Sequence, residues 1–178
     1  ISAEESKLHI KSRYDRIFNS NIESNNNENI YIFENSNINY ILQVCKDFDF
    51  IIIDSIQAIF DNSLSTPIGS TSQVKACIDK IVSYLRDNEE KVFFILAHIT
   101  KSGLIAGPKF LEHMVHTTLF LESKDNYRIL RVKKNRYGPT EEIGIFIMTP
   151  FGLQENQISI DNRDSKSAGS VYFLFPEG

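Results

Sequence analysis

The chain has 178 residues, of which 42% are hydrophobic and 24% are charged, as is ordinary for one folded domain. Its 19 lysines and arginines and 23 aspartates and glutamates give a net charge of −4, which excludes a uniformly basic nucleic-acid binder but leaves a local basic patch open. Two cysteines, Cys45 and Cys77, are too few for a disulfide scaffold or a four-cysteine zinc site. No apolar run approaches the ~20 residues of a membrane-spanning helix, so no membrane partner is expected.

The first half of the chain alternates between helical and strand-like patterns. Residues 19–29, rich in Asn and Glu, are predicted to form a mobile surface loop. The expected elements are helices over 4–18, 38–45 and 70–87 and buried strands over 30–33, 50–53 and 92–97. Because the strands are continuously apolar and alternate with helices, they predict an α/β fold with a mostly parallel sheet covered on both faces.

The second half changes to short strand-like segments over 117–122, 127–133 and 142–148, separated by turn signals. These segments predict an antiparallel meander that extends the parallel sheet. A last strand-like run over 171–175 is consistent with the start of another domain.

Polar residues follow two of the predicted strands, at the sheet edge where α/β proteins bind ligands. Asp54 ends the strand over 50–53, where a carboxylate either positions a magnesium ion through water or caps the next turn. His98 follows the strand over 92–97 on the same edge, as either a functional residue or a hydrogen-bonded structural histidine.

Two loops and one charge run are candidates for contact with anions. Residues 66–73 lead into a helix through a Ser or Thr cap, and their pattern alone indicates a connecting loop. The glycines of 103–113, with Lys101 and Lys109, suit a phosphate backbone or any surface loop. Six basic residues and one acid give the stretch 124–138 a charge of +5, and the remaining 13 basic and 22 acidic residues give −9. This segregation indicates an anion-facing edge or, alternatively, a solvated strand face.

Several short motifs, in the same order along the chain, resemble those of bacterial RadA proteins, also called Sms. They are Ser2-Ala3-Glu4-Glu5-Ser6, Ile53-Asp54-Ser55-Ile56-Gln57, Gly69-Ser70 with Ser72-Gln73-Val74, His98-Ile99-Thr100-Lys101, Ile105-Ala106-Gly107-Pro108-Lys109 and Lys134-Asn135-Arg136-Tyr137-Gly138. The last is the most specific, because it resembles the lysine-asparagine-arginine-aromatic-glycine signature of that family. The resemblance runs from Ile1 to about Leu153.

The resemblance implies a RecA-like P-loop NTPase core over 1–153, incomplete at its N-terminus, and over 154–178 a linker with the possible start of a Lon-protease-like domain. RadA proteins are DNA-dependent ATPases of recombinational repair that form hexameric rings and drive branch migration. Implied cofactors are ATP and Mg²⁺, with zinc expected only in a missing N-terminal element. Implied partners are single-stranded or branched DNA, further copies of the chain and a RecA-type recombinase, in a bacterial cytoplasm or an organelle of bacterial origin.

Carried over residue by residue, the resemblance also implies roles for individual side chains. Glu4 would polarise the attacking water, Asp54 would hold Mg²⁺ through water, and His98 would sense the γ-phosphate. Lys134 and Arg136 would be positively charged fingers offered to a neighbouring subunit's nucleotide. The side chains expected to face DNA are Ser70, Gln73, Lys101 and Lys109.

The chain departs from the family pattern in ways that bear on function. The 178 residues contain no G-x-x-x-x-G-K-[ST] phosphate loop, which RadA proteins carry just upstream of the position of Ile1. We therefore expect the chain to be a fragment or processed product that alone binds ATP poorly or not at all. One alternative is a degenerate RecA-fold subunit that binds DNA or partners without hydrolysis. Another is a relative of hexameric replicative helicases, against which the signature over 134–138 argues.

Overall fold

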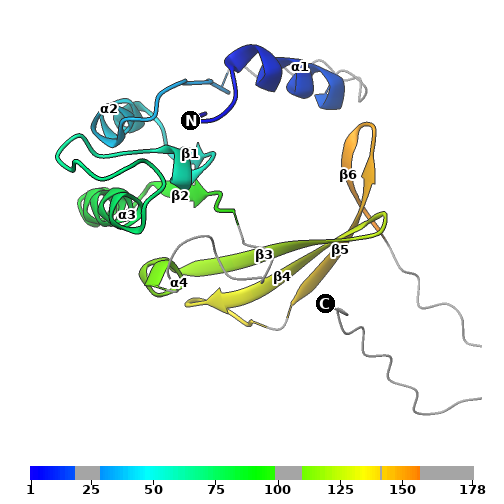
Figure 1. Cartoon of the computed structure of the whole chain (residues 1–178). Helices are drawn as coiled ribbons and strands as arrows, with labels where there is room; N and C mark the ends of the chain where they lie inside the picture. The colour runs from blue at the N-terminus through cyan, green and yellow to red at the C-terminus, as the bar shows by residue number, and fades with distance from the viewer. Residues whose placement is uncertain (19–28, 99–109, 141, 157–178) are drawn as a thin grey trace, which may run out of the picture.

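The computed structural model describes residues 1–18, 29–98, 110–140 and 142–156 (Figure 1). Its helices are α1 (Lys7–Phe18), α2 (Ile38–Val44), α3 (Thr71–Arg86) and α4 (Phe110–Met114), with 3₁₀ turns η1 (Cys45–Asp47) and η2 (Ile56–Ala58). Its strands are β1 (Phe50–Ile53), β2 (Val92–Ile95), β3 (Thr117–Lys124), β4 (Tyr127–Asn135), β5 (Ile143–Thr149) and β6 (Gly152–Glu155). Among these residues no helix is both long and apolar enough to cross a membrane.

Strands β1 and β2 form a parallel pair in which Phe50 lies opposite Val92 and Ile53 opposite Ile95. Ile51 and Ile53 point into the core, whereas Phe50 and Ile52 are 58% and 47% exposed. In the described part of the chain, the expectation of a sheet covered on both faces is therefore wrong. The alternation of side chains along a strand places the apolar run on both faces, and helices pack against only one of them.

The expected strand over 30–33 does not form. Its residues Ile30 and Tyr31 are exposed, and the carbonyl of Phe33 accepts a hydrogen bond from the N–H of Ser2 at 2.9 Å, beside an isolated parallel bridge between Glu34 and Ser2. Ser2 also bridges Asp54 in parallel, and the N–H of Ala3 donates to the carbonyl of Asp54 at 2.9 Å. The first residues of the chain thus extend the sheet beside β1.

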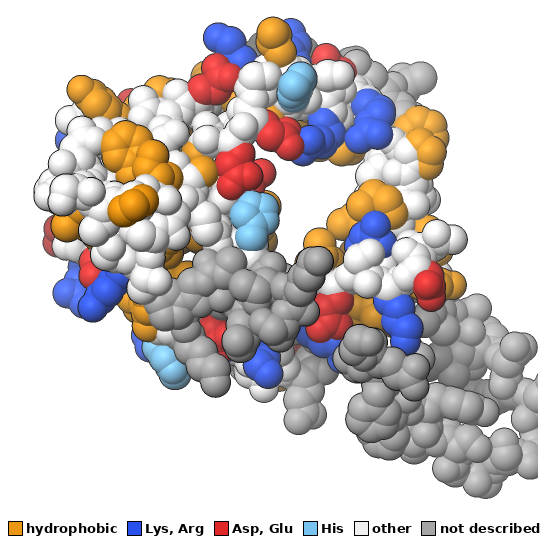
Figure 2. Space-filling model, in the orientation of Figure 1, with side chains coloured by type: hydrophobic (Ala, Val, Ile, Leu, Met, Phe, Trp, Pro, Cys, Tyr) orange, Lys and Arg blue, Asp and Glu red, His pale blue; other side chains and the backbone are white. Residues whose placement is uncertain are grey.

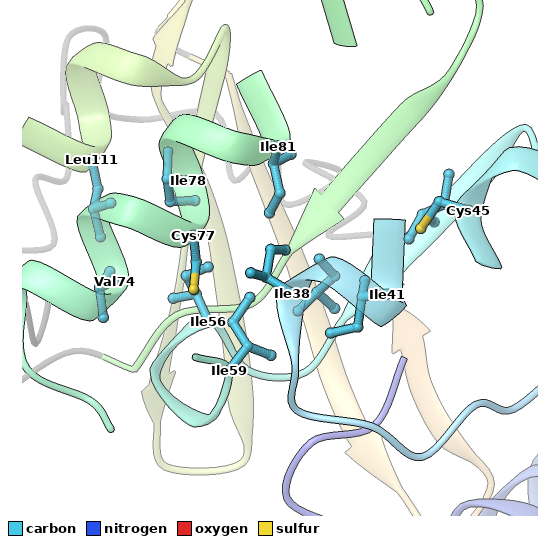
Figure 3. Packing of buried hydrophobic residues seen from close by; sticks show 12 residues of the cluster. Ile38, Ile41, Cys45, Ile56, Ile59, Val74, Cys77, Ile78, Ile81 and Leu111 are labelled. Atoms are coloured by element: carbon cyan, nitrogen blue, oxygen red, sulfur yellow. The ribbon is translucent and has the colours of Figure 1, made fainter. Parts of the chain in front are cut away.

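The hydrophobic core lies between the parallel sheet and the helices α2 and α3 (Figure 3). Helix α3 buries one stripe at helical spacing, and Ser70 caps its first turn by accepting a hydrogen bond from the N–H of Gln73. Each fully buried aliphatic side chain contributes about 1.5–3 kcal/mol relative to an exposed one. The fully buried aliphatic residues of this core include Ile38, Ile41, Ile53, Ile56, Ile59 and Val74.

The core also contains two cysteines. Burial raises the pKa of Cys45 to about 11 and that of Cys77 to about 12, so both thiols are protonated at neutral pH.

Strands β3 to β6 form the predicted antiparallel meander. The expectation that this meander extends the parallel sheet is wrong in the described residues, where it is a sheet separate from β1 and β2. The β3–β4 turn contains Asp125 with a φ of 51°, in the left-handed region that Asp tolerates. The register shifts near the start of β3: Leu119 lies opposite Val132 and Thr118 opposite Lys134, which leaves Lys133 as the extra residue of a β-bulge.

The far end of this sheet lies beside α1. A Cβ atom at Gly152, whose φ is 104°, would lie 3.7 Å from Cγ1 of Ile17. Strand β6 continues to Glu155, two residues past the expected end of the core. The strand-like run predicted over 171–175 and residues 19–28 of the loop predicted over 19–29 lie outside the described residues.

Candidate functional site

Three residues that are far apart in the sequence meet at the carboxyl edge of the parallel sheet. Ser55 follows β1, and its hydroxyl donates a hydrogen bond to Oε1 of Glu4. His98 follows β2, and its Nε2 lies 3.2 Å from the same Glu4 oxygen. Figure 2 shows acidic and histidine side chains beside an opening between the part holding the parallel sheet and the part holding β5 and β6. The expectation from the sequence that His98 shares an edge with Asp54 agrees with this geometry, and the structure adds Glu4 to the same edge.

The carboxylate of Glu4 is held in its ionised form. The hydrogen bond from Ser55 is the largest influence that lowers the pKa of Glu4; partial burial opposes it, and the contact with His98 adds to it. Ser55 is fully buried, whereas the Glu4 side chain is 39% exposed. Glu4 therefore combines a fixed orientation with an open side, as a group that accepts a proton from bound water requires.

Gln57 fixes the backbone at His98. Its side-chain Oε1 accepts a hydrogen bond from the N–H of His98 at 3.4 Å, and its Nε2 donates to the carbonyl of His98 at 3.3 Å. Sequence reasoning assigned no role to Ser55 or Gln57. The available signal was their position in the motif Ile53-Asp54-Ser55-Ile56-Gln57, directly after the candidate magnesium residue.

Asp54 lies at the end of β1, next to this cluster. Its backbone N–H donates to the carbonyl of Ile1 at 3.1 Å, and its carboxylate makes no hydrogen bond or ion pair with another described residue. The described residues contain no group of three or more His, Cys, Asp and Glu side chains that could hold a metal ion. A single free carboxylate fits Mg²⁺ bound through water, because that ion retains several waters and takes the rest of its ligands from phosphate.

The signature segment Lys134 to Gly138 comprises the last two residues of β4 and the turn that follows it. Oδ1 of Asn135 accepts hydrogen bonds from the N–H of Tyr137 at 3.2 Å and from the hydroxyl of Thr117 at 3.3 Å. A Cβ at Gly138 would lie 2.8 Å from Nδ2 of Asn135, so the glycine allows the amide to sit inside the turn. The backbone N–H of Arg136 donates to the carbonyl of His116 at 3.0 Å, while its side chain is exposed. The turn therefore presents Arg136 to solvent.

Lys134, the other expected finger, points into the molecule. Its Nζ donates hydrogen bonds to the carbonyls of Glu112 at 2.6 Å, Val115 at 2.7 Å and His113 at 3.3 Å. These carbonyls lie at the carboxyl end of α4. The structure thus separates the two residues that the sequence pattern places together.

The basic run over 124–138 does not present all its cations to one side. Arg131 forms an ion pair with Glu122 at 3.4 Å, and the side chain of Arg128 donates a hydrogen bond to the backbone carbonyl of Tyr127 at 2.9 Å. With Lys134 turned inward as well, half of the six basic side chains have partners within the described part of the chain. The exposed members of the run are Lys124, Lys133 and Arg136.

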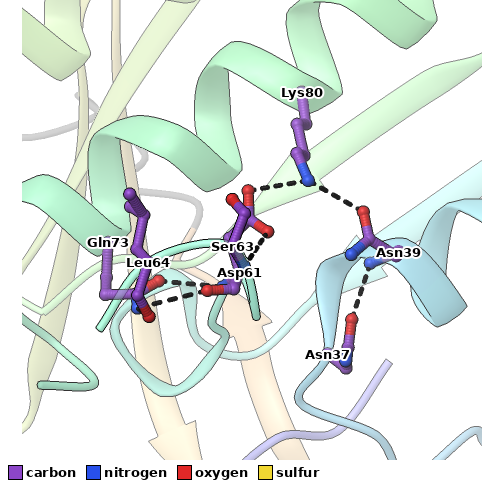
Figure 4. A network of polar contacts seen from close by, with 7 residues as sticks. All are labelled: Asn37, Asn39, Asp61, Ser63, Leu64, Gln73 and Lys80. Carbon is purple, nitrogen blue, oxygen red and sulfur yellow. Dashed lines mark hydrogen bonds and ion pairs between the residues drawn. The ribbon is translucent and has the colours of Figure 1, made fainter. Parts of the chain in front are cut away.

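Of the residues expected to face DNA, Lys101 and Lys109 lie outside the described residues, and Ser70 is the partly exposed cap of α3. Gln73 is only 2% exposed, and it is not available for a direct contact (Figure 4). Its Oε1 accepts from the N–H of Asp61 at 2.8 Å, and its Nε2 donates to the carbonyl of Thr66 at 3.1 Å. The direct role expected for Gln73 is therefore wrong: its amide instead holds the loop before α3, which runs over 59–70.

The same loop is tied to two helices by an ion pair. Nζ of Lys80 on α3 lies 2.7 Å from Oδ2 of Asp61 and donates to Oδ1 of Asn39 on α2 at 2.8 Å (Figure 4). The bond from Lys80, and after it the N–H of Ser63, lowers the pKa of the buried Asp61. The loop over 59–70 is therefore held at Asp61 by Lys80 and at Thr66 by Gln73.

The fold of the chain resembles those of solved ATPases, although no protein-family model matches the sequence. One such structure is an ATPase domain, with a TM-score of 0.62 and 14% identity over 88% of this chain and 73% of that one. Another is a DnaB-like replicative helicase, with a TM-score of 0.63 and 15% identity over 83% of this chain and 48% of that one. Because these identities are low, the two similarities show the fold alone, and that fold agrees with the predicted α/β core of an ATPase.

By sequence the whole chain matches proteins named DNA repair protein RadA. The Bacillus subtilis protein is 36% identical and the chain spans 39% of it; the Rickettsia conorii protein is 38% identical, with 41% of its length spanned. The Streptococcus pneumoniae protein is 37% identical, and 43% of its length is spanned. All three matches cover 100% of this chain. The chain belongs to the RadA family and spans about two fifths of the length of these relatives.

Proposed function

We propose that the protein to which this chain contributes is an ATP-dependent DNA repair and recombination protein that hydrolyses ATP in response to DNA. The observation that carries this proposal is the ionised Glu4, oriented by Ser55 and His98 beside the free carboxylate of Asp54. ATP hydrolysis needs an acceptor for a proton of the attacking water and a second carboxylate that holds Mg²⁺ through water. The two carboxylates at this edge match these two requirements.

Each side chain at the edge has a distinct proposed task. Glu4 orients water and accepts its proton, and Asp54 would hold Mg²⁺, which when bound neutralises charge on the phosphates. His98 shares an oxygen of Glu4 with Ser55, so a phosphate that attracts the imidazole also changes the environment of the Glu4 carboxylate. The 178 residues include no phosphate loop, and we propose that residues elsewhere in the protein bind the β- and γ-phosphates.

The proposed partners are DNA and further copies of the protein. Exposed Arg136 is well placed to meet a phosphate of a neighbouring subunit's nucleotide, which would couple hydrolysis to assembly as a hexameric ring. DNA contact is assigned to the exposed loop before α3, including Ser70, and to Lys101 and Lys109. Branch migration of recombination intermediates, cooperation with a RecA-type recombinase and a bacterial cytoplasmic location complete the proposal.

A matched pair of neighbouring glutamates tests the central assignment. In the full-length protein, Glu4→Gln should lower DNA-stimulated ATP hydrolysis by at least about a hundredfold while nucleotide binding is retained. The control is Glu5→Gln. The Glu5 carboxylate forms an ion pair with Arg13 at 2.8 Å, outside the cluster of Glu4, Ser55 and His98. Equal turnover in the two variants would contradict the role of Glu4. A wild-type protein that binds DNA without hydrolysing ATP would instead support the alternative of a non-catalytic RecA-fold subunit.

A further inference from the structure

The ammonium group of Lys134 has all of its donors engaged. An ammonium carries three N–H donors, and the three hydrogen bonds of Lys134 lead to the carbonyls of Glu112, His113 and Val115. The last carbonyls of a helix have no partner within the helix and carry partial negative charge. Lys134 therefore satisfies the carboxyl end of α4, and it would have to break these bonds to offer a proton to a phosphate.

The β-bulge in β4 sets the direction of Lys134. Lys133 is the extra residue, so Lys134 takes the position opposite Thr118 while Lys133 is exposed. A bulge shifts the alternation of side chains and can re-aim one of them. Of these two adjacent lysines, Lys134 therefore binds backbone carbonyls, whereas Lys133 is exposed to solvent.

Helix α4 connects the two sheets through this lysine. Leu111 of α4 is a buried member of the core cluster formed by α2, α3 and β1. The carboxyl end of the same helix is held by Lys134 of β4, in the separate antiparallel sheet, and Figure 1 shows α4 at the end of β3 and β4. The two bonds from Lys134 shorter than 3 Å therefore anchor the turn that carries Arg136 to the core.

We propose that Lys134 is a positioning residue and not a phosphate-contacting finger: it clamps the end of α4 and thereby sets where Arg136 stands. This inference rests on the proposed function for the task of Arg136. It changes the assignment of the signature segment, in which one cation builds the support and the other reaches the bound anion.

Amide hydrogen exchange of the full-length protein tests the clamp without requiring ATP hydrolysis. In Lys134→Met, which keeps the stem but removes the donors, exchange in 110–117 should rise about tenfold, as loss of roughly 1.4 kcal/mol of local stability implies. Arg136→Ala and Lys133→Met should leave exchange in that segment unchanged. Wild-type exchange in Lys134→Met would overturn the clamp.

The conservative variant Lys134→Arg separates a clamp from a finger, even if the methionine variant folds poorly. A finger needs only positive charge near phosphate, so arginine should preserve ATPase activity. A planar guanidinium cannot aim its donors at three converging carbonyls as an ammonium does, so the clamp predicts both raised exchange in 110–117 and reduced turnover. Full turnover with wild-type exchange in Lys134→Arg would overturn the proposal. If the wild-type protein lacks ATPase activity, the proposed function fails, while the exchange result still decides whether the clamp exists.

Discussion

The hydroxyl of Ser55 donates its hydrogen bond to the carboxylate of Glu4, across 51 residues of sequence. Ser55 is the second residue after β1, whereas Glu4 follows the isolated bridge that Ser2 makes with Asp54. The bond therefore links two neighbouring extended segments at the edge of the sheet. It is the largest influence that keeps the pKa of Glu4 below its ordinary value.

Ser55→Ala should shift the acid limb of the pH–rate profile of the full-length ATPase to higher pH. Without the hydroxyl the pKa of Glu4 rises toward or above the ordinary carboxyl value of about 4.3, because burial and the lost bond both disfavour the charged form. Turnover at neutral pH should fall by about tenfold, since the carboxylate also loses its fixed orientation. The control is Ser83→Ala, which removes an exposed hydroxyl on α3 outside the cluster. Superimposable pH profiles for Ser55→Ala and wild type would contradict the positioning role of Ser55.

Arg136→Ala should abolish DNA-stimulated ATP hydrolysis while leaving nucleotide binding largely intact. A cation that meets a neighbour's phosphate acts on the transition state, and such fingers are worth about 10³–10⁵ in rate. Arg128→Ala is the matched control, because Arg128 belongs to the same basic run but bonds to the carbonyl of Tyr127. Turnover and single-nucleotide binding, measured side by side, distinguish the two variants. The assignment of Arg136 fails if its alanine variant turns over at the wild-type rate.

Lys80→Met should lower the free energy of unfolding by about 2 kcal/mol at neutral pH, as it leaves the buried Asp61 carboxylate without its cation. The pKa of Asp61 is depressed in the folded state, so its stabilising contribution is present above the unfolded value of about 3.9 and is lost as pH falls through the folded value. The difference between Lys80→Met and wild type should therefore narrow below about pH 4. Urea unfolding at several pH values measures it, with Lys75→Met, on the exposed face of α3, as the control. A constant difference at all pH values would count against the ion pair.

Gln73→Ala and Lys101→Ala should weaken DNA binding in different ways. The buried amide of Gln73 holds the loop before α3 through the backbone of Asp61 and Thr66, so its loss should lower affinity without changing the salt dependence. Lys101→Ala or Lys109→Ala should lower the salt slope by about one phosphate contact each. Titrations at several salt concentrations separate the two effects. Wild-type salt slopes in both lysine variants would remove that loop from the DNA interface.

Strong local patterns made much of the fold predictable. The apolar stripe of α3, its Ser70 cap and the Asp125-Asn126 turn between β3 and β4 are signals within a few residues of the elements they specify. The prediction of a strand over 30–33 is wrong although this run is as apolar as β1. Among the described residues it forms no ladder with another strand, and an isolated bridge joins the adjacent Glu34 to Ser2. Pairing between distant segments decides such a case, and local composition carries no information about it.

In the candidate site, too, some features follow from the local sequence and others depend on contacts between distant residues. Placing Asp54 and His98 at one edge needs only the rule that parallel strands end together, and the sequence suffices for it. The hydrogen bond from Ser55, the burial of Gln73 and the inward turn of Lys134 depend on tertiary contacts. A bulge of one residue decides which of two adjacent lysines is exposed, and no periodicity in the sequence marks it.

The uncovered face of the parallel pair has a practical consequence for work with the chain in solution. A contiguous apolar surface is formed by the exposed side chains of Phe50, Ile52, Val92 and Phe94. Exposing apolar surface to water costs about 25 cal/mol of free energy per Å². Surfaces of this kind promote adhesion between molecules. A purified 178-residue chain should bind hydrophobic dyes and change its sedimentation with concentration, so assays with it call for dilute samples and mild detergent.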